Sequence, residues 1–213
     1  MREQINLKDL QRKAWRSMFQ DGLWDIFLGL LLLNMAFGTV LDEMPISDGL
    51  RIGTYIGVEV LAMVLMFLGK RYITMPRMGT ASFGRYGKVK RNRVQLLLFG
   101  SFLLGVIAWL AFSGGGELGV LGISRAYVGA IFWVVNMLVV FGLAGYFLDF
   151  PRLYLIGILY AIPIPMDIFI RQHWHTDAWV FPVFAVPSLI ILGVGVVLFI
   201  QFLRKYPVVA QAG

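Results

Sequence analysis

The stretch "GLWDIFLGLLLLNMAFGTVL", residues 22–41, decides the fold, because it is almost wholly apolar and carries one charged side chain, Asp25. A helix needs about 20 apolar residues to cross about 30 Å of hydrocarbon at about 1.5 Å per residue. Further stretches of this kind occupy residues 50–69, 95–113, 127–148, 153–170 and 179–203. They are continuously apolar, whereas the strands of a membrane β-barrel alternate polar and apolar residues. We therefore predict an all-α integral membrane protein with six transmembrane helices.

The composition agrees with this fold class. Of the 213 residues, 59% are hydrophobic and 15% are charged, whereas a soluble domain has about 25% charged residues. The absence of cysteine excludes disulfides, thiolate metal sites and cysteine nucleophiles. The chain divides into an N-terminal segment (1–21), a six-span domain (22–205) and a short tail (206–213). The N-terminal segment is polar for too long to be a cleavable signal peptide.

Positive charge gathers in a loop between the second and third spans (70–94), whose main part "RYITMPRMGTASFGRYGKVKRNR" (71–93) contains no acidic residue. With six spans, this loop and both termini lie on one side of the membrane. That side holds all of the 19 basic residues except Arg51, Arg125 and Arg171. Because basic residues favour the cytoplasmic side, we expect the loop and both termini in the cytoplasm. The glycines of "GTASFGRYG" (79–87) lead us to expect an extended or partly mobile loop.

Beyond setting the topology, the basic loop offers two kinds of contact. Its positive charges are attracted to anionic lipid headgroups, and they would equally dock an acidic protein partner. Nucleic acid is not expected, because the charge lies at the membrane surface with only scattered aromatic residues. The residues assigned to this contact are Arg77, Arg85, Lys88, Lys90, Arg91 and Arg93.

The N-terminal segment has helical periodicity. One face carries apolar residues and the other carries basic ones, a pattern typical of a helix that lies in the membrane interface. We expect an interfacial amphipathic helix within residues 1–21; the alternative is a helix packed against the cytoplasmic loops. The apolar face consists of Leu7, Leu10, Ala14 and Met18, and the basic face includes Lys8, Arg12 and Arg16.

Three stretches together resemble a loose group of uncharacterised prokaryotic multi-pass membrane proteins: "FQDGLWDIFLGLLLL" (19–33), "KRYITMPRMGTASF" (70–83) and "FPRLYLIGILYAI" (150–162). The group has a cytoplasmic segment of the form basic-aromatic-x-Thr-x-Pro-Arg-x-Gly. This chain departs from it at Met75, where an aromatic residue is expected. The resemblance implies a multi-pass protein of a prokaryotic plasma membrane, and it implies no activity.

Charged side chains inside the spans are costly, by about 2.5–3.5 kcal/mol near the bilayer centre, and are therefore candidate functional residues. Glu59 lies in the middle of the second span, one turn after Tyr55. It is either an ion- or proton-binding carboxylate or a protonated group in a helix interface. The same span carries Gly53 and Gly57, which permit close helix approach within the chain or between chains of a homo-oligomer.

Asp25 is a candidate of a different kind. With Gly22, Gly29 and Ala36 it falls on one stripe of the first span. This stripe predicts a close-packing face, in which the carboxylate pairs with Arg77 or another residue of the basic loop. We therefore expect a structural role for Asp25.

The fifth span holds Asp167 after Pro163 and Pro165. The two prolines remove backbone donors and predict an unwound or kinked helix. An outer polar cluster follows, which we interpret as an exposed interfacial loop or as a pH-sensitive gate. Its histidines lack the spacing of a helical metal site, so neither a metal nor a cofactor is predicted. The cluster consists of Arg171, His173, His175 and Asp177.

These observations favour a non-enzymatic protein, because no nucleophile–base pair or nucleotide-binding motif is present. The leading hypothesis is a scaffold or accessory subunit that contacts anionic lipid or a partner through its basic cytoplasmic face. The alternative is a small transporter or channel, proton-coupled through Glu59 and Asp167, because transporters often bind ions at broken helices.

Overall fold

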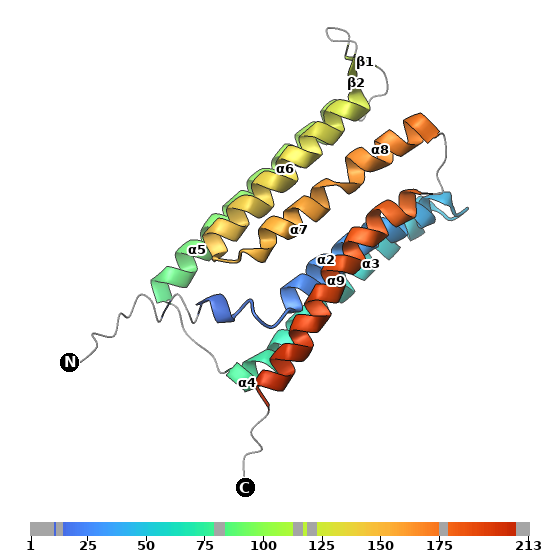
Figure 1. Cartoon of the computed structure of the whole chain (residues 1–213). Helices are drawn as coiled ribbons and strands as arrows, with labels where there is room; N and C mark the ends of the chain where they lie inside the picture. The colour runs from blue at the N-terminus through green and yellow to red at the C-terminus, as the bar shows by residue number, and fades with distance from the viewer. Residues whose placement is uncertain are drawn as a thin grey trace, which may run out of the picture. The chain divides into compact units, whose positions relative to one another are not determined.

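A computed structural model describes residues 11, 15–78, 84–112, 117–118, 123–174 and 179–207. The chain forms two compact units (Figure 1). Unit 1 combines Met1–Gly87 with Ala185–Gly213, and unit 2 is Lys88–Phe184. Each unit is considered by itself below.

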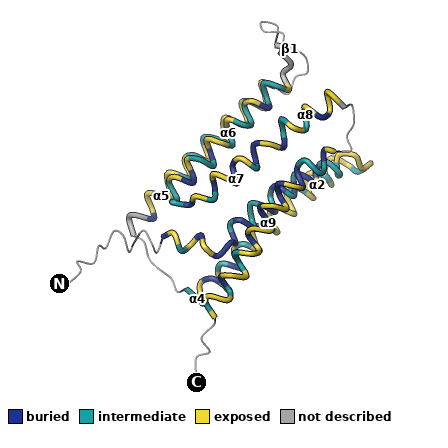
Figure 2. The backbone as a smooth tube through the Cα atoms, in the orientation of Figure 1, coloured by how far each residue is buried: buried dark blue, intermediate teal, exposed yellow. Residues whose placement is uncertain are grey.

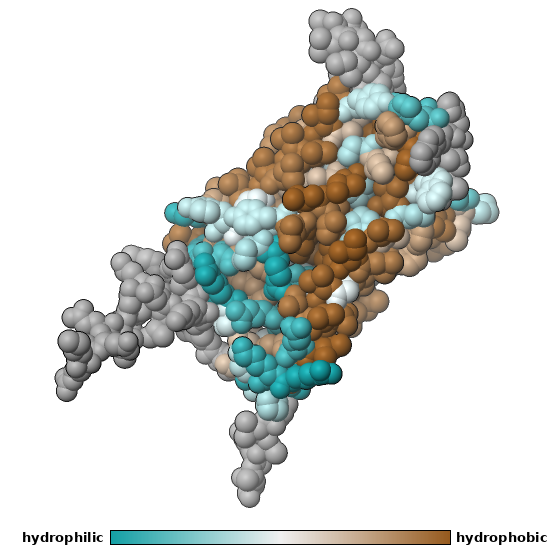
Figure 3. Space-filling view, in the orientation of Figure 1, coloured by the Kyte–Doolittle hydropathy of each residue, from teal (hydrophilic) through white to brown (hydrophobic). Residues whose placement is uncertain are grey.

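The prediction of six spans is confirmed. Within the described residues, six helical stretches are long and apolar enough to cross a membrane, and hydrophobic surface runs along the helices (Figure 3). They are Leu23–Glu43, Asp48–Met78, Gly87–Ala108, Ala126–Leu148, Arg152–His173 and Val180–Lys205.

Unit 1 begins with an antiparallel pair of helices, α2 (Leu23–Glu43) and α3 (Asp48–Leu68). Asp25 lies in the first turn of α2, where the helix dipole favours negative charge. The helix ends at an extended Met44, before Pro45. Ser47 then caps α3, since its hydroxyl accepts the Leu50 amide at 3.4 Å. These terminal signals explain why the hairpin turns within a few residues.

Helix α3 does not end at the apolar boundary. A π-helical segment, η1 (Gly69–Thr74), and the short helix α4 (Met75–Met78) continue it. Helix α5 (Gly84–Phe112) then begins before the third apolar stretch. The expectation of an extended loop over 70–94 is therefore wrong for the described residues: helical structure covers 70–78 and 84–94, and residues 79–83 lie outside the description.

The third long helix of unit 1 is α9 (Val180–Lys205), most of which belongs to this unit. It packs closely on α2 through glycine. A Cβ atom at Gly195 would lie 2.7 Å from the Ile26 backbone nitrogen, and one at Gly29 would lie 2.7 Å from Leu192 Cγ. Gly22 precedes α2 with φ 74°, and a Cβ there would lie 2.4 Å from the Gly195 carbonyl oxygen. Only glycine fits these contacts, so the seam depends on it.

The stripe predicted on the first span lies at this seam. Asp25 is 1% exposed, and Gly29 and Ala36 are also buried. Buried residues recur along α2 and α9, separated by half-buried or exposed residues (Figure 2). The close-packing face inferred from the spacing of small residues is therefore present in the structure.

Unit 2 contains α5, a minimal hairpin of β1 (Glu117–Leu118) and β2 (Ile123–Ser124), and α6 (Arg125–Leu148). It continues with α7 (Arg152–Ala161) and α8 (Pro163–Trp174). Helix α6 packs on α7 and α8. Helix α5 meets α6 through polar pairs, one of which is the hydrogen bond from Ser101 Oγ to Asn136 Oδ1 at 3.1 Å.

The fifth span is interrupted between α7 and α8, as its prolines predict. Ile162 keeps helical dihedral angles (φ −70°, ψ −42°) and donates to the Ile158 carbonyl at 3.3 Å. The interruption is therefore a kink rather than an unwound segment. The Trp133 indole donates to the Tyr160 carbonyl at 2.9 Å, so a side chain of α6 hydrogen-bonds the backbone of α7 beside the kink.

Most of the predicted amphipathic helix (1–21) lies outside the described residues and remains a prediction. In the described part, Trp15 and Phe19 are each 7% exposed and make an edge contact with centroids 6.0 Å apart. Met18, which was assigned to the apolar face, is 43% exposed.

Candidate functional site

Asp21 in unit 1 is a charged residue whose side chain is fully buried. It sits one residue before Gly22, at the start of α2, and it accepts the Leu23 amide at 3.3 Å. Its other oxygen accepts the Lys70 ammonium at 2.6 Å and the Thr74 hydroxyl at 2.8 Å. A backbone amide, an ammonium and a hydroxyl thus all donate to this carboxylate. The cluster therefore connects the start of α2 to η1, the continuation of α3.

Lys70 is held from two sides. Besides Asp21, its ammonium donates to the Met18 carbonyl at 2.6 Å, and it interacts electrostatically with the buried Asp25. The spacing from Lys70 to Thr74, one helical turn, brings both donors to the same carboxylate. The π-helical segment η1 holds this arrangement, in keeping with the frequent use of π-helical turns at special sites.

Arg77 joins the same part of the chain to α9. Its guanidinium donates to the carbonyls of Leu203 at 3.3 Å and Tyr206 at 2.9 Å. These carbonyls lie at the end of α9, where a cation is favoured by the helix dipole. These hydrogen bonds of Arg77 go to α9, and the residue of the basic loop that interacts electrostatically with Asp25 is Lys70.

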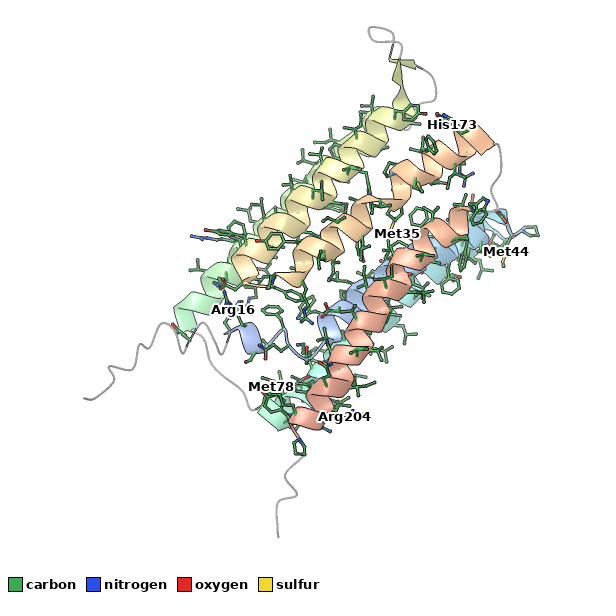
Figure 4. The ribbon with its side chains drawn as sticks, viewed as in Figure 1. Arg16, Met35, Met44, Met78, His173 and Arg204 are labelled. Carbon is green, nitrogen blue, oxygen red and sulfur yellow. The ribbon has the colours of Figure 1, made fainter. Side chains whose placement is uncertain are left out.

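The two ends of unit 1 differ in charge. At one end, Arg51 pairs with Asp48 at 3.2 Å and with Asp42 at 3.5 Å. At the other end, α9 finishes in two exposed basic residues, Arg204 and Lys205. Figure 4 shows Met78 and Arg204 together at this basic end and Met44 at the opposite end of the unit. The charge asymmetry seen in the sequence is therefore present within one compact unit.

Unit 2 has an ion pair of its own between Lys90, near the start of α5, and Asp149, just after α6. Each side chain is 15% exposed. Asp149 has φ 55°, and the amides of Asp149 and Phe150 donate to the carbonyls of Tyr146 and Gly145. This is the Schellman arrangement that ends a helix with a left-handed residue. The pair therefore joins the termini of neighbouring helices, as Asp21 and Lys70 do in unit 1.

The remaining basic residues of the predicted contact surface lie on α5. Arg93 lies over the Phe147 ring at 5.8 Å and is exposed. Lys88 and Arg91 are exposed on α5. Arg85 belongs to the first turn of α5, but its side chain lies outside the description.

The residues of the transporter hypothesis in unit 1 are not enclosed. Glu59 lies on the exposed side of α3, between Val58 and Val60. The hydroxyl of Tyr55 reaches Gly38 on α2, where a Cβ would lie 1.7 Å from it. The motif of Gly53 and Gly57 also faces open space, with no atom of the described chain within 4 Å of a Cβ at either glycine.

In unit 2, Asp167 accepts Arg171 Nε at 2.8 Å, one turn along α8. His173 stacks on Phe169 with centroids 4.2 Å apart, while His175 and Asp177 lie outside the described residues. Among the residues that the structure describes, no group of three or more histidine, cysteine or carboxylate side chains is placed to hold a metal ion.

Sequence reasoning missed the two ion pairs that organise these sites. From the sequence, Asp21 is the last residue of the N-terminal segment, and Lys70 is one of many basic residues on the expected cytoplasmic side. One signal was available: Lys70 and Thr74 are one turn apart, and Thr74 belongs to the segment on which the family resemblance rests. Comparison of the chain with family models, with curated proteins and with solved structures found no match.

Proposed function

We propose that this chain is a non-enzymatic scaffold or accessory subunit of a prokaryotic plasma membrane, and that its basic face rests on anionic lipid headgroups. The observation that carries the proposal is the burial of two aspartates, each in an ion pair with a lysine. Asp21 is fully buried on Lys70, and Asp149 is largely buried on Lys90. Both carboxylates are largely removed from the surface. The exposed basic residues near them are therefore available to anionic groups outside the chain.

The placement of the remaining charge supports the same proposal. Arg71, Lys88, Arg91, Arg204 and Lys205 are exposed. Each positive charge held near an anionic membrane surface contributes about 1 kcal/mol of attraction. Several such charges make the orientation of the chain, and its choice of lipid, depend on the headgroups.

The sidedness follows from the number of spans. In a six-span chain the start of α2, the end of α3, the start of α5, the end of α6 and the end of α9 face the same compartment. These are the termini that carry the basic residues, and basic residues favour the cytoplasm. We therefore place both chain termini in the cytoplasm. Cysteine labelling of Ser47→Cys and Ser17→Cys in sealed cells tests this: only the former should react with an impermeant reagent.

Lipid preference tests the functional proposal. The purified protein is placed in nanodiscs of phosphatidylcholine and in nanodiscs containing phosphatidylglycerol, and its Tm is measured in each at low and high salt. We expect a higher Tm with phosphatidylglycerol and a smaller difference at high salt, because salt screens exposed charges. Equal Tm values in the two lipids at low salt would overturn the proposal.

A further inference from the structure

Helix α5 is the least covered of the long helices. Within its membrane span only a small share of residues is buried, and Ala108 is its buried hydrophobic residue among those described. Its packing side carries Lys90 and Ser101, which reach Asp149 and Asn136. On the opposite side of the helix, the described residues between Lys88 and Leu110 are exposed.

The exposed side of α5 is polar at one end and apolar beyond it. Lys88 and Arg91 lie at the polar end and are exposed. Farther along, Leu96 is 73%, Phe99 60% and Phe102 66% exposed. Helical spacing places Lys88, Phe99 and Phe102 on the same side. From residue 96 to residue 106 the helix advances about 15 Å, which is half the thickness of the hydrocarbon core.

Among the described residues of unit 2, positive charge exceeds negative charge at this end of α5. Asp149, the acidic residue beside the start of α5, is bound by Lys90. The first turn of α5 contains no acidic residue, although the helix dipole favours negative charge there. Lys88 and Arg91 therefore add positive charge near the N-terminus of α5, where the helix dipole is also positive. An anion from outside the chain would be attracted by both.

We propose that the exposed side of α5 binds an anionic phospholipid, with its headgroup phosphate on Lys88 and Arg91 and an acyl chain along Phe99 and Phe102. The inference rests on the proposed function and deepens it by naming the lipid site. The order of groups along the helix, cationic and then apolar over one leaflet, matches the order of groups in such a lipid. A cation at the headgroup and an aromatic surface at the chains supply complementary contacts.

Photolabelling tests the site. The full chain is reconstituted in vesicles of phosphatidylcholine and phosphatidylglycerol that contain a trace of phosphatidylglycerol with a photoreactive group in its acyl chain. A parallel sample carries phosphatidylcholine with the same acyl chain. The ratio of labelling by the two probes is measured for the peptides of each helix. We expect a ratio of about five or more on α5, because each cation favours the anionic lipid several-fold.

Variants locate the headgroup contact. The double substitution Lys88→Gln and Arg91→Gln should bring the α5 ratio close to one, whereas Lys88→Arg with Arg91→Lys should keep it high. The matched control, Arg204→Gln with Lys205→Gln, removes the same charge from α9 and should leave α5 unchanged.

Three results would overturn the site in different ways. A ratio near one on α5 together with a high ratio on other helices would refute the α5 site and leave the proposed function standing. A ratio near one on every helix would refute both. Crosslinking between α5 helices of two chains, with no lipid labelling there, would show that a second copy covers this side.

Discussion

Two glycines of α9 provide a sharp test of the seam with α2. Gly195 and Gly193 lie in the same helix, two residues apart, but only Gly195 faces α2. A Cβ at Gly195 would lie 2.7 Å from the Ile26 nitrogen and 3.1 Å from the Asp25 carbonyl carbon, both of which are backbone atoms. A Cβ at Gly193 would meet no atom within 4 Å. Substitution by alanine at the two positions therefore differs only in the space available.

The expected magnitudes follow from this difference. Alanine favours a helix over glycine by about 1 kcal/mol, so Gly193→Ala should leave stability unchanged or raise it by up to that amount. Gly195→Ala should lower the free energy of unfolding by about 1–3 kcal/mol, as overpacking does in cores. The helices must separate by several tenths of an ångström, which forfeits about a quarter to a half of the dispersion energy of each contact across the seam.

The assay is reversible unfolding in mixed detergent micelles at increasing mole fractions of dodecyl sulfate, followed by tryptophan fluorescence. Wild type, Gly193→Ala and Gly195→Ala are compared under identical conditions. If Gly195→Ala proved as stable as Gly193→Ala, the close contact between α2 and α9 would not exist in the membrane protein, and the reasoning would fail.

Further predictions concern the polar contacts. Asp21→Asn should destabilise by about 3 kcal/mol, because Lys70 loses the countercharge of a buried pair, and addition of Lys70→Met should recover most of this loss; unfolding curves that show no recovery would contradict the pairing. Trp133→Phe should cost about 1 kcal/mol by removing the hydrogen bond from the indole to the Tyr160 carbonyl, measured in the same assay, and an unchanged midpoint would mean that the bond contributes nothing. Asp149→Ala and Asp149→Gly both remove the ion pair, but alanine should be less stable by about 1–2 kcal/mol, because only glycine adopts positive φ freely; equal stability would argue against a left-handed residue there.

The sequence predicts the spans well because their information is local. A block of about 20 apolar residues is sufficient for a span, and all six agree with the structure to within a few residues, apart from the longer ends of the helices that bound the basic segment. The small-residue stripe with Asp25 was also predictable, because helical periodicity places its members on one face whatever they contact. The spacing could not show that the partner is α9, which lies far away in the sequence.

Glycine spacing alone did not distinguish a packed face from an open one. Gly29 and Gly53 both belong to patterns of small residues, yet Gly29 lies against Leu192, while the position above Gly53 is open. The difference depends on which neighbour arrives on which side. That choice is made by contacts such as Tyr55 against Gly38, which no pattern within one helix contains.

In the basic segment, local sequence predicted a loop where the structure has helix. Its glycines and charges are typical of a loop, and they led to the prediction of an extended chain. The structure instead continues the helix through η1, because Lys70 and Thr74 reach Asp21, and Arg77 reaches the end of α9. Lys70 and Asp21 are 49 residues apart, so this stabilisation comes from tertiary contacts that local propensity cannot reveal.

Unit 1 is assembled from two pieces of the chain, and this has a consequence for biosynthesis. Its first piece ends at Gly87, and the part of α9 that belongs to it, from Ala185 onward, is synthesised only after unit 2. Before α9 is inserted, the glycine face of α2 and the guanidinium of Arg77 lack the contacts that they make with α9. The ion pair of Asp21 and Lys70 needs only α2 and α3, so it can form early and hold the hairpin together in that interval. Insertion of α9 then completes the unit. If translation stops before residue 185, the polar and glycine-lined surface of the truncated chain stays uncovered, and cellular proteases that recognise incompletely packed membrane proteins can act on it.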